Sequence, residues 1–194
     1  LARWNANSKS FHSVMVKMNN SIQNSLFVNC LLESENGESI YMGGEGFLYK
    51  YTPVHETWEN IIGLESDNVK SLSKGSDGHI LIGTDNGVFD MFNGSMKHYR
   101  HDSRQELSLA DNEIWCIYVD SQSNVWTGHE RGVSIASNSG YIRTIKLSTL
   151  THSGEGNEIH VIHRDSKNNL WLAGTNGVIK LSDNSAPAWY RHSD

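Results

Sequence analysis

The chain has 194 residues, of which 37% are hydrophobic and 20% are charged, a balance typical of a globular protein with an apolar core. Its 16 basic and 22 acidic residues give a formal net charge of −6. This charge argues against a nucleic-acid partner, because there is no basic stripe to neutralise phosphates. No apolar run approaches the roughly 20 residues that a membrane helix needs, so no membrane span is expected in this segment.

The first eighteen residues read as the second half of a repeating unit. Residues 1–4 correspond to the segment that follows the closing Gly-Val pair of later repeats, and residues 5–10 read as a turn. Residues 11–18 then read as an outer strand. The chain is therefore expected to open on a half-blade at 1–18, with the two inner strands of that blade missing.

Four repeats follow, each with a short apolar run, a polar turn, an aliphatic pair or an aliphatic–aromatic pair, and a closing Gly–aliphatic or Gly–aromatic pair. The second member of the first pair is Tyr41, Leu81, Trp126 and Trp171, at spacings of 40, 45 and 45 residues. A period of about 40–50 residues that carries several short strands is the signature of propeller blades. The predicted blades cover about 25–62, 67–101, 112–147 and 157–190, in a single partial propeller over 1–194.

The predicted strands are short and separated by Asn, Asp, Ser and Gly clusters, as antiparallel meanders require. The first full blade is expected to contain strands at 28–32, 40–43, 47–51 and 57–61, and the second blade its outer strands at 88–92 and 96–99. Apolar residues fall on both faces of the inner strands, as Ile114, Ile117 and Val119 illustrate. Two apolar faces indicate sheets stacked on either side. The predicted fold class is all-β, a β-propeller fragment of about four four-stranded antiparallel blades plus an N-terminal half-blade.

The last five residues, 190–194, echo the segment 99–103, so the sequence stops where another inner strand is expected. Four and a half blades then leave a sheet face uncovered at each end. Exposed blade faces are a liability unless neighbours cover them. The expected partners are the remaining blades of a larger propeller, or a second copy of the chain in a dimer.

Cys30 and Cys116 are the only thiols. They occupy equivalent positions two blades apart, too far from one another for the roughly 4.4–6.8 Å between Cα atoms that a disulfide requires. Both are interpreted as small buried residues.

The repeat resembles the two-component regulator propeller, which occurs in tandem in the extracytoplasmic sensor region of hybrid histidine kinases of gut Bacteroidetes. The residues that carry the resemblance are Ile114, Ile117, Asp120, Asn124-Val125-Trp126 and Gly132-Val133, with Ile159, Ile162, Asp165, Asn169-Leu170-Trp171 and Gly177-Val178 in the next repeat. The second blade departs from the pattern at Gly75 and Leu81, and the first at Tyr41.

The resemblance implies a parent protein that senses oligosaccharides released from a polysaccharide and signals through a membrane helix to a kinase. It implies a periplasmic, extracytoplasmic location for these residues and no cofactor. Any kinase activity lies outside this segment.

Several recurring residues have a structural interpretation. Trp126 and Trp171, which suggest sugar platforms, are expected to pack between blades. Asp120 and Asp165 begin polar turns without the terminal Glu of a calcium loop, so they are expected to cap those turns. The closing glycines, such as Gly132, suit a turn that needs positive φ or close backbone approach.

No catalytic or metal-binding residue is assigned. His160 and His163 stand three apart on a predicted strand, where side chains point to opposite faces. His98 and His101 have the same spacing. Clustered carboxylates or Arg and Tyr groups directed at one centre, which catalytic propellers need, are not evident.

Ligand binding is instead expected where the sequence varies within the constant frame. The loops between second and third strands differ from blade to blade, although bland solvated turns remain an alternative. Lys70, Trp115 and His160 occupy equivalent positions 45 residues apart, one residue after the first aliphatic of each inner strand, and are expected to border the central channel. The candidate ligand-binding residues are Lys70, Asp85, Asn86, Trp115, His129, Glu130, Arg131, His160, Thr175 and Asn176.

Three functions remain open from the sequence. The first is a non-enzymatic sensor in which Trp115 stacks on a sugar, although Trp115 could equally be a blade-packing residue. The second is a propeller enzyme that acts on carbohydrate, a lyase or a glycosidase, which requires an acid/base group with a perturbed pKa at the channel mouth. The third is a protein-interaction scaffold of the WD40 kind, although the Gly-His and Trp-Asp marks of that family are absent.

Overall fold

A computed structural model describes residues 2–13, 17–18, 21–22, 26–137, 139–146, 158–182 and 185–191. Within these ranges the chain contains strands and turns, and no helix that could span a membrane is found there. The predicted blade borders at 25, 147 and 157, and positions 14–16 of the predicted outer strand, lie outside the described residues.

Four four-stranded antiparallel sheets follow one another along the described chain, so the predicted fold class is confirmed. Each sheet is a meander in which sequence neighbours are hydrogen-bonded. The strands agree with the predicted ones to within about a residue, because alternating apolar residues and Gly- and Asn-rich turns mark them clearly. The four sheets are β5 (Val28–Glu33), β6 (Ile40–Gly44), β7 (Phe47–Thr52) and β8 (Thr57–Asn60); β9 (Val69–Lys74), β10 (Ile80–Thr84), β11 (Gly87–Phe92) and β12 (Ser95–Tyr99); β13 (Cys116–Val119), β14 (Val125–His129), β15 (Gly132–Ala136) and β16 (Ile142–Lys146); and β17 (Ile159–Arg164), β18 (Leu170–Gly174), β19 (Gly177–Ser182) and β20 (Ser185–Tyr190).

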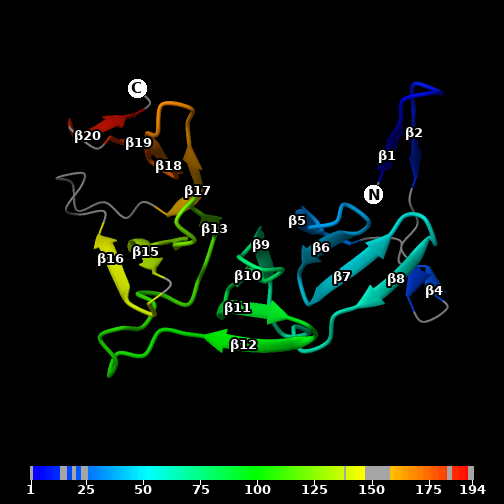
Figure 1. The fold of residues 1–194 in the computed structure, drawn as a ribbon, viewed down its shortest axis with the longest axis horizontal. Coiled ribbons are helices and arrows are strands. Elements are labelled where there is room, and N and C mark those ends of the chain that lie inside the picture. Colours follow the sequence, from blue (N-terminus) through cyan, green and yellow to red (C-terminus); the bar gives the residue numbers. More distant parts are fainter. Residues whose placement is uncertain are drawn as a thin grey trace.

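The four sheets, called blades 1 to 4 from here on, lie side by side along an arc (Figure 1). The first strands β5, β9, β13 and β17 lie on its inner side, where each contacts the next. The last strands β8, β12, β16 and β20 lie on its outer side. The first strand of every blade therefore lines the centre of the arc, as in a propeller.

Two further pairs of strands precede blade 1. Strands β1 (Ala2–Asn5) and β2 (Ser10–Ser13) form an antiparallel hairpin in which Trp4 faces Phe11 across the strands. Strand β3 (Lys17–Met18) pairs with β4 (Ser21–Ile22). The predicted outer strand over 11–18 includes most of β2 and all of β3, and its positions 14–16 lie outside the described residues.

Successive blades pack closely because the second strand carries a glycine at the point of contact. A Cβ atom on Gly128 would lie 2.5 Å from the Ile159 carbonyl oxygen and 2.5 Å from the Cys116 sulfur. Real Cβ contacts are not so short, so only glycine lets the first aliphatic of the next blade approach. The same relationship joins Gly43 to Val69 and Gly83 to Ile114.

Both cysteines are free, as predicted, and lie in these contacts between blades. The Cys116 thiol lies 3.4 Å from the Ile159 carbonyl oxygen, to which it donates a hydrogen bond. Burial raises the pKa of Cys116 to about 12 and that of Cys30 to about 11. Both thiols therefore stay protonated at neutral pH and act as small core residues.

The polar turn between first and second strands is held by its aspartate. The Asp165 carboxylate accepts hydrogen bonds from the Lys167 and Asn169 backbones at 2.9 Å and from the Trp171 indole nitrogen at 2.8 Å. Bonds from Trp171 and Asn169 hold the pKa of this carboxyl well below its usual range. Asp120 makes the equivalent bonds to Trp126, which confirms that these aspartates cap turns.

Candidate functional site

A β-bulge marks the start of the first strand in three blades. In blade 2, Val69 pairs with Thr84 and Ser71 pairs with Gly83, which leaves Lys70 without a partner in the ladder. His160 is skipped in the same way in blade 4, and Asn29 in blade 1. A bulge interrupts the alternation of a strand and redirects one side chain. Trp115 takes the same position in blade 3, where its backbone N–H donates to the Gly128 carbonyl.

These equivalent side chains meet across the blades in a row. The Lys70 ammonium lies 3.4 Å from the centroid of the Trp115 ring. The Trp115 ring lies 4.7 Å, centroid to centroid, from the His160 ring, which it meets edge on. We call Asn29, Lys70, Trp115 and His160 the bulge row. The structure therefore brings together the three residues that the sequence placed at the channel.

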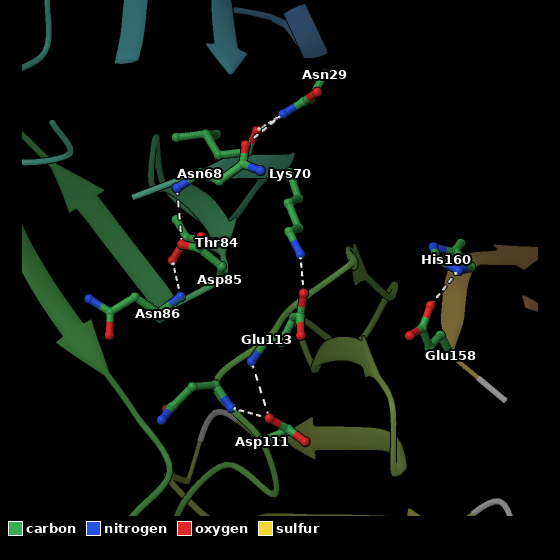
Figure 2. A network of polar contacts seen from close by, with 12 residues as sticks. Asn29, Asn68, Lys70, Thr84, Asp85, Asn86, Asp111, Glu113, Glu158 and His160 are labelled. Atoms are coloured by element: carbon green, nitrogen blue, oxygen red, sulfur yellow. Dashed lines mark hydrogen bonds and ion pairs between the residues drawn. The ribbon is translucent and has the colours of Figure 1, made fainter. Parts of the chain in front are cut away.

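Carboxylates pair with the two basic residues of the row, Lys70 and His160. Lys70 Nζ lies 2.5 Å from Glu113 Oε1, and His160 Nε2 lies 3.3 Å from Glu158 Oε2 (Figure 2). The Lys70 side chain is only 11% exposed, whereas that of His160 is 40% exposed. His160 and Glu158 therefore offer polar groups to solvent, while Lys70 is enclosed by its partners.

Asn29 belongs to the same row but was not among the predicted residues. Its side-chain amide donates to Asn68 Oδ1 at 2.8 Å and to the Val69 carbonyl at 3.0 Å (Figure 2). The signal was present in the sequence, because Asn29 also follows the first aliphatic of its blade. The spacing of 41 residues to Lys70, rather than 45, separated it from the other three.

The turn between β10 and β11 is bound to the start of β9. Asp85 accepts a hydrogen bond from the Asn68 backbone at 3.0 Å (Figure 2). The Asn86 amide donates to the buried Asp67 carboxylate at 2.8 Å. The predicted residues Asp85 and Asn86 thus lie near the bulge row. Their polar groups are used to fix the loop that leads into Lys70.

The equivalent turn of blade 3 contains His129, Glu130 and Arg131. His129 is completely buried, accepts a hydrogen bond from the Arg131 backbone at its Nδ1 atom, and lies 3.0 Å from Ser134 Oγ through Nε2. Burial lowers its pKa to about 4, so the ring is neutral at pH 7. His129 stabilises the turn from the interior of the blade, while Glu130 and Arg131 are exposed.

Arg131 is joined to the bulge row through Asp111. The Arg131 guanidinium lies 3.4 Å from one Asp111 oxygen, and the other oxygen accepts the Glu113 backbone N–H at 3.2 Å. Glu113 in turn binds Lys70. In blade 4 the predicted Thr175 and Asn176 form an exposed turn whose Thr175 N–H donates to the Glu158 carbonyl at 3.3 Å. Each turn thus contacts the segment that begins the first strand.

The end of the first strands that carries the bulge row is acidic. Lys70 and Arg131 are the cations of the turns between second and third strands and of the first-strand starts that they contact, and His129 is neutral. Carboxylates are more numerous there: Glu45, Asp67, Asp85, Asp111, Glu113, Glu130 and Glu158.

The four meandering sheets, joined along the arc by their first strands, define this chain as a segment of a β-propeller. Residues 108–131 match the family described as "Two component regulator propeller". The chain carries the repeat of that family, and the resemblance recognised in the sequence is confirmed.

Solved structures support this assignment. The extracellular domain of the putative hybrid two component system BT4673 from B. thetaiotaomicron is 32% identical to all of this chain, with a TM-score of 0.65. The same domain, described as a putative one component system, gives 33% identity and a TM-score of 0.63. The chain spans 27% of the length of both. No curated protein matches.

Two more distant structures show the fold alone. The extracellular domain of the putative hybrid two component system BT3049 from B. thetaiotaomicron has a TM-score of 0.76 at 20% identity, over 98% of this chain and 25% of its own. Virginiamycin B lyase from Staphylococcus aureus has a TM-score of 0.70 at 13% identity, over 98% of this chain and 62% of its own.

Proposed function

We propose that this chain is a ligand-sensing propeller segment in the extracytoplasmic, periplasmic part of a hybrid two-component sensor, and that it binds an oligosaccharide without chemically changing it. The support is its likeness to extracellular domains with that description at 32–33% identity. The parent protein would pass the binding signal to a histidine kinase. The chain itself acts only as the receptor surface.

The observation that carries the proposal is the bulge row. Four equivalent positions, one per blade, hold different side chains, Asn, Lys, Trp and His, and three of them are skipped in the ladder of their sheet. Core positions of a repeat hold similar residues because packing fixes their size, whereas these positions vary. A row of planar and polar side chains over a rigid scaffold suits the hydroxyl pattern of a sugar.

The contacts assign different roles within the row. Lys70 covers one face of Trp115, so a sugar ring has no access to that face while Lys70 remains in place. We therefore assign Trp115 the role of positioning Lys70 and His160. The exposed polar groups that receive the ligand are His160, Glu158 and Asn29.

The charge around the bulge row favours a neutral ligand. Carboxylates outnumber the two cations there, and both cations are already paired with carboxylates. An anionic ligand would face like charges, which costs free energy and slows association. A neutral oligosaccharide uses carboxylate and imidazole groups as hydrogen-bond partners without that cost.

Calorimetry with neutral oligosaccharides of two to six sugars tests this function. The variants are His160→Ala and Glu158→Gln, and the matched control is His163→Ala, an exposed histidine of the same strand. We expect an oligosaccharide that binds the unmodified protein and the control but binds both site variants about tenfold more weakly. Binding that persists undiminished in both site variants would place the ligand elsewhere.

A further inference from the structure

The opposite end of the first strands carries three equivalent recesses, one between each pair of neighbouring blades. Each is lined by the polar turn of one blade and by the end of the first strand of the next blade. Since the repeat builds all three in the same way, differences in their linings reflect side chains rather than backbone. Those linings differ in charge.

The first recess contains a cation that has partners, and the second recess has a largely apolar lining. Between blades 1 and 2, Lys74 faces Glu33 and Glu35, and its ammonium donates to the Ser34 carbonyl at 3.2 Å. Between blades 2 and 3, the residue equivalent to Lys74 is Val119, and Leu81 adds to an apolar lining. Neither recess presents a cation that lacks a partner.

The recess between blades 3 and 4 holds two arginines. Arg164 ends β17, at the position of Lys74 and Val119, and lines a cavity of about 360 Å³ together with Arg143 of β16. One terminal nitrogen of Arg164 donates to the Asn168 carbonyl and side-chain oxygens at 3.3 and 3.0 Å. Its Nε atom is buried and has no acceptor among the described residues.

Arg143 has no carboxylate opposite it in the sheet. In blade 1 the corresponding cross-strand pair is Lys50 with Glu59, and in blade 2 it is Asp90 with Lys97. Arg143 instead faces Ile135. The third and fourth strands of blade 3 thus keep the cation of this pair and lose its anion.

Asp120 is the one carboxylate that lines this recess in the described structure, and its oxygens already accept hydrogen bonds from its own turn. Its oxygens accept hydrogen bonds from the backbones of Gln122 and Asn124, from the Asn124 amide and from the Trp126 indole. Although burial raises the pKa of Asp120, these bonds lower it below its ordinary value. Asp120 therefore binds its own turn, and guanidinium donors remain open to the recess.

We propose that the recess between blades 3 and 4 binds the carboxylate of a sugar-sized organic acid, a uronic acid being the simplest example. A guanidinium presents N–H donors in a planar fork that matches a carboxylate, and the resulting charge-assisted bonds are about twice as strong as neutral ones. Tyr141 and Gln122, also in the lining, supply a ring and an amide for the uncharged part of the ligand.

This site does not depend on the oligosaccharide site. It lies at the other end of the first strands, and it has the opposite charge preference. Glu113 and Glu158 make the bulge row unfavourable for an anion, whereas Arg143 and Arg164 make this recess favourable. Either site can therefore fail in experiment without changing the result for the other.

Calorimetry of the purified protein with galacturonate at low salt tests the proposal, with galactose as the uncharged counterpart. We expect galacturonate to bind and galactose not to bind. Arg143→Gln and Arg164→Gln should each weaken binding about tenfold or more, because each removes charge-assisted hydrogen bonds to the carboxylate. Lys97→Gln, which removes a cation from the equivalent cross-strand position of blade 2, should leave the affinity unchanged.

Melting temperatures accompany each titration. If Arg164→Gln does not fold, the galacturonate affinity of Arg143→Gln decides the test, because Arg143 is an exposed residue of an outer strand. Equal binding of galactose and galacturonate, or affinity for galacturonate that neither arginine substitution lowers relative to the unmodified protein, would overturn the proposal. Acetate bound as tightly as galacturonate would reduce the site to a bare anion site, and tighter binding of N-acetyl-aspartate would point to an acidic peptide. Both results would contradict a sugar acid.

Discussion

The Lys70 ammonium lies over the ring of Trp115, 3.4 Å from its centroid, although the two residues belong to different blades. The same ammonium binds Glu113 at 2.5 Å, so one cation joins blade 2 to both a ring and a carboxylate of blade 3. Because the Lys70 side chain is only 11% exposed, salt screens these contacts less than it screens a surface pair. The contacts of Lys70 therefore stabilise the packing of blade 2 against blade 3, and they also fix the arrangement of the bulge row.

Replacing Lys70 by methionine is expected to lower the free energy of unfolding by about 1 kcal/mol. The substitution removes the cation–π contact but keeps the aliphatic stem, and Glu113 is exposed enough to be solvated afterwards. Urea unfolding followed by tryptophan emission checks both the stability and the Trp115 environment. Lys97→Met on the outer strand is the control, with an expected change within about 0.5 kcal/mol. Equal effects of the two substitutions would contradict the prediction.

Gly128→Ala is expected to destabilise the protein by about 1–3 kcal/mol, because the new methyl group collides with the Ile159 backbone and the Cys116 sulfur. Gly140→Ala provides a comparison that separates collision from backbone strain. Gly140 has a φ of 81° and nothing within 4 Å of its Cβ position, so strain alone acts there. Thermal unfolding measures both. A smaller loss at Gly128 than at Gly140 would show that the blades do not meet at this glycine.

Stability is expected to fall between about pH 6.5 and pH 4 because of His129. Burial lowers the pKa of the folded-state imidazole to about 4, below its ordinary value of 6.5. Below pH 6.5 the unfolded chain therefore binds a proton that the folded chain does not, which favours unfolding by at most about 3 kcal/mol at pH 4. Denaturant unfolding of the unmodified protein and of His129→Gln over this range checks the effect. Parallel curves for the two proteins would exclude His129 as the cause.

The face of blade 1 that points away from blade 2 and the face of blade 4 that points away from blade 3 are expected to promote self-association. Leu31 is 54% exposed and Val161 51% exposed, whereas Cys116, the equivalent of Val161 in blade 3, is 8% exposed. Light scattering and binding of a hydrophobic dye should both decrease when Leu31 and Val161 are replaced by serine. A monodisperse monomer that binds no dye before substitution would show that these faces do not attract a partner.

The repeat period was sufficient to predict the four blades and their strands. Tyr41, Leu81, Trp126 and Trp171 recur at nearly constant spacing because the tight packing of adjacent blades restricts their size and position. The hairpin of β1 and β2 agrees with the predicted turn over 5–10 and the strand that follows it, whereas the short pair of β3 and β4 was not predicted.

The candidate site was predicted in part. The equivalence of Lys70, Trp115 and His160 was visible in the sequence, but the bulge that brings them together was not, because alternation over a short strand does not reveal a skipped residue. The burial of His129 could not be predicted either. Its polar neighbours in the turn suggested exposure, whereas its bonds to Ser134 and the Arg131 backbone place it in the interior.

The bulge has a consequence for how such a repeat changes over evolutionary time. Asn29, Lys70 and His160 stand outside the ladder of their sheets, and Trp115 precedes the first ladder pair of blade 3. The aliphatic residues before three of them, Val69, Ile114 and Ile159, are fully buried. A mutation at the bulged position therefore changes the surface at this end of the first strands while the buried aliphatic next to it stays the same. Each blade contributes one such position, so duplication of a blade adds a new, independently variable residue to that surface.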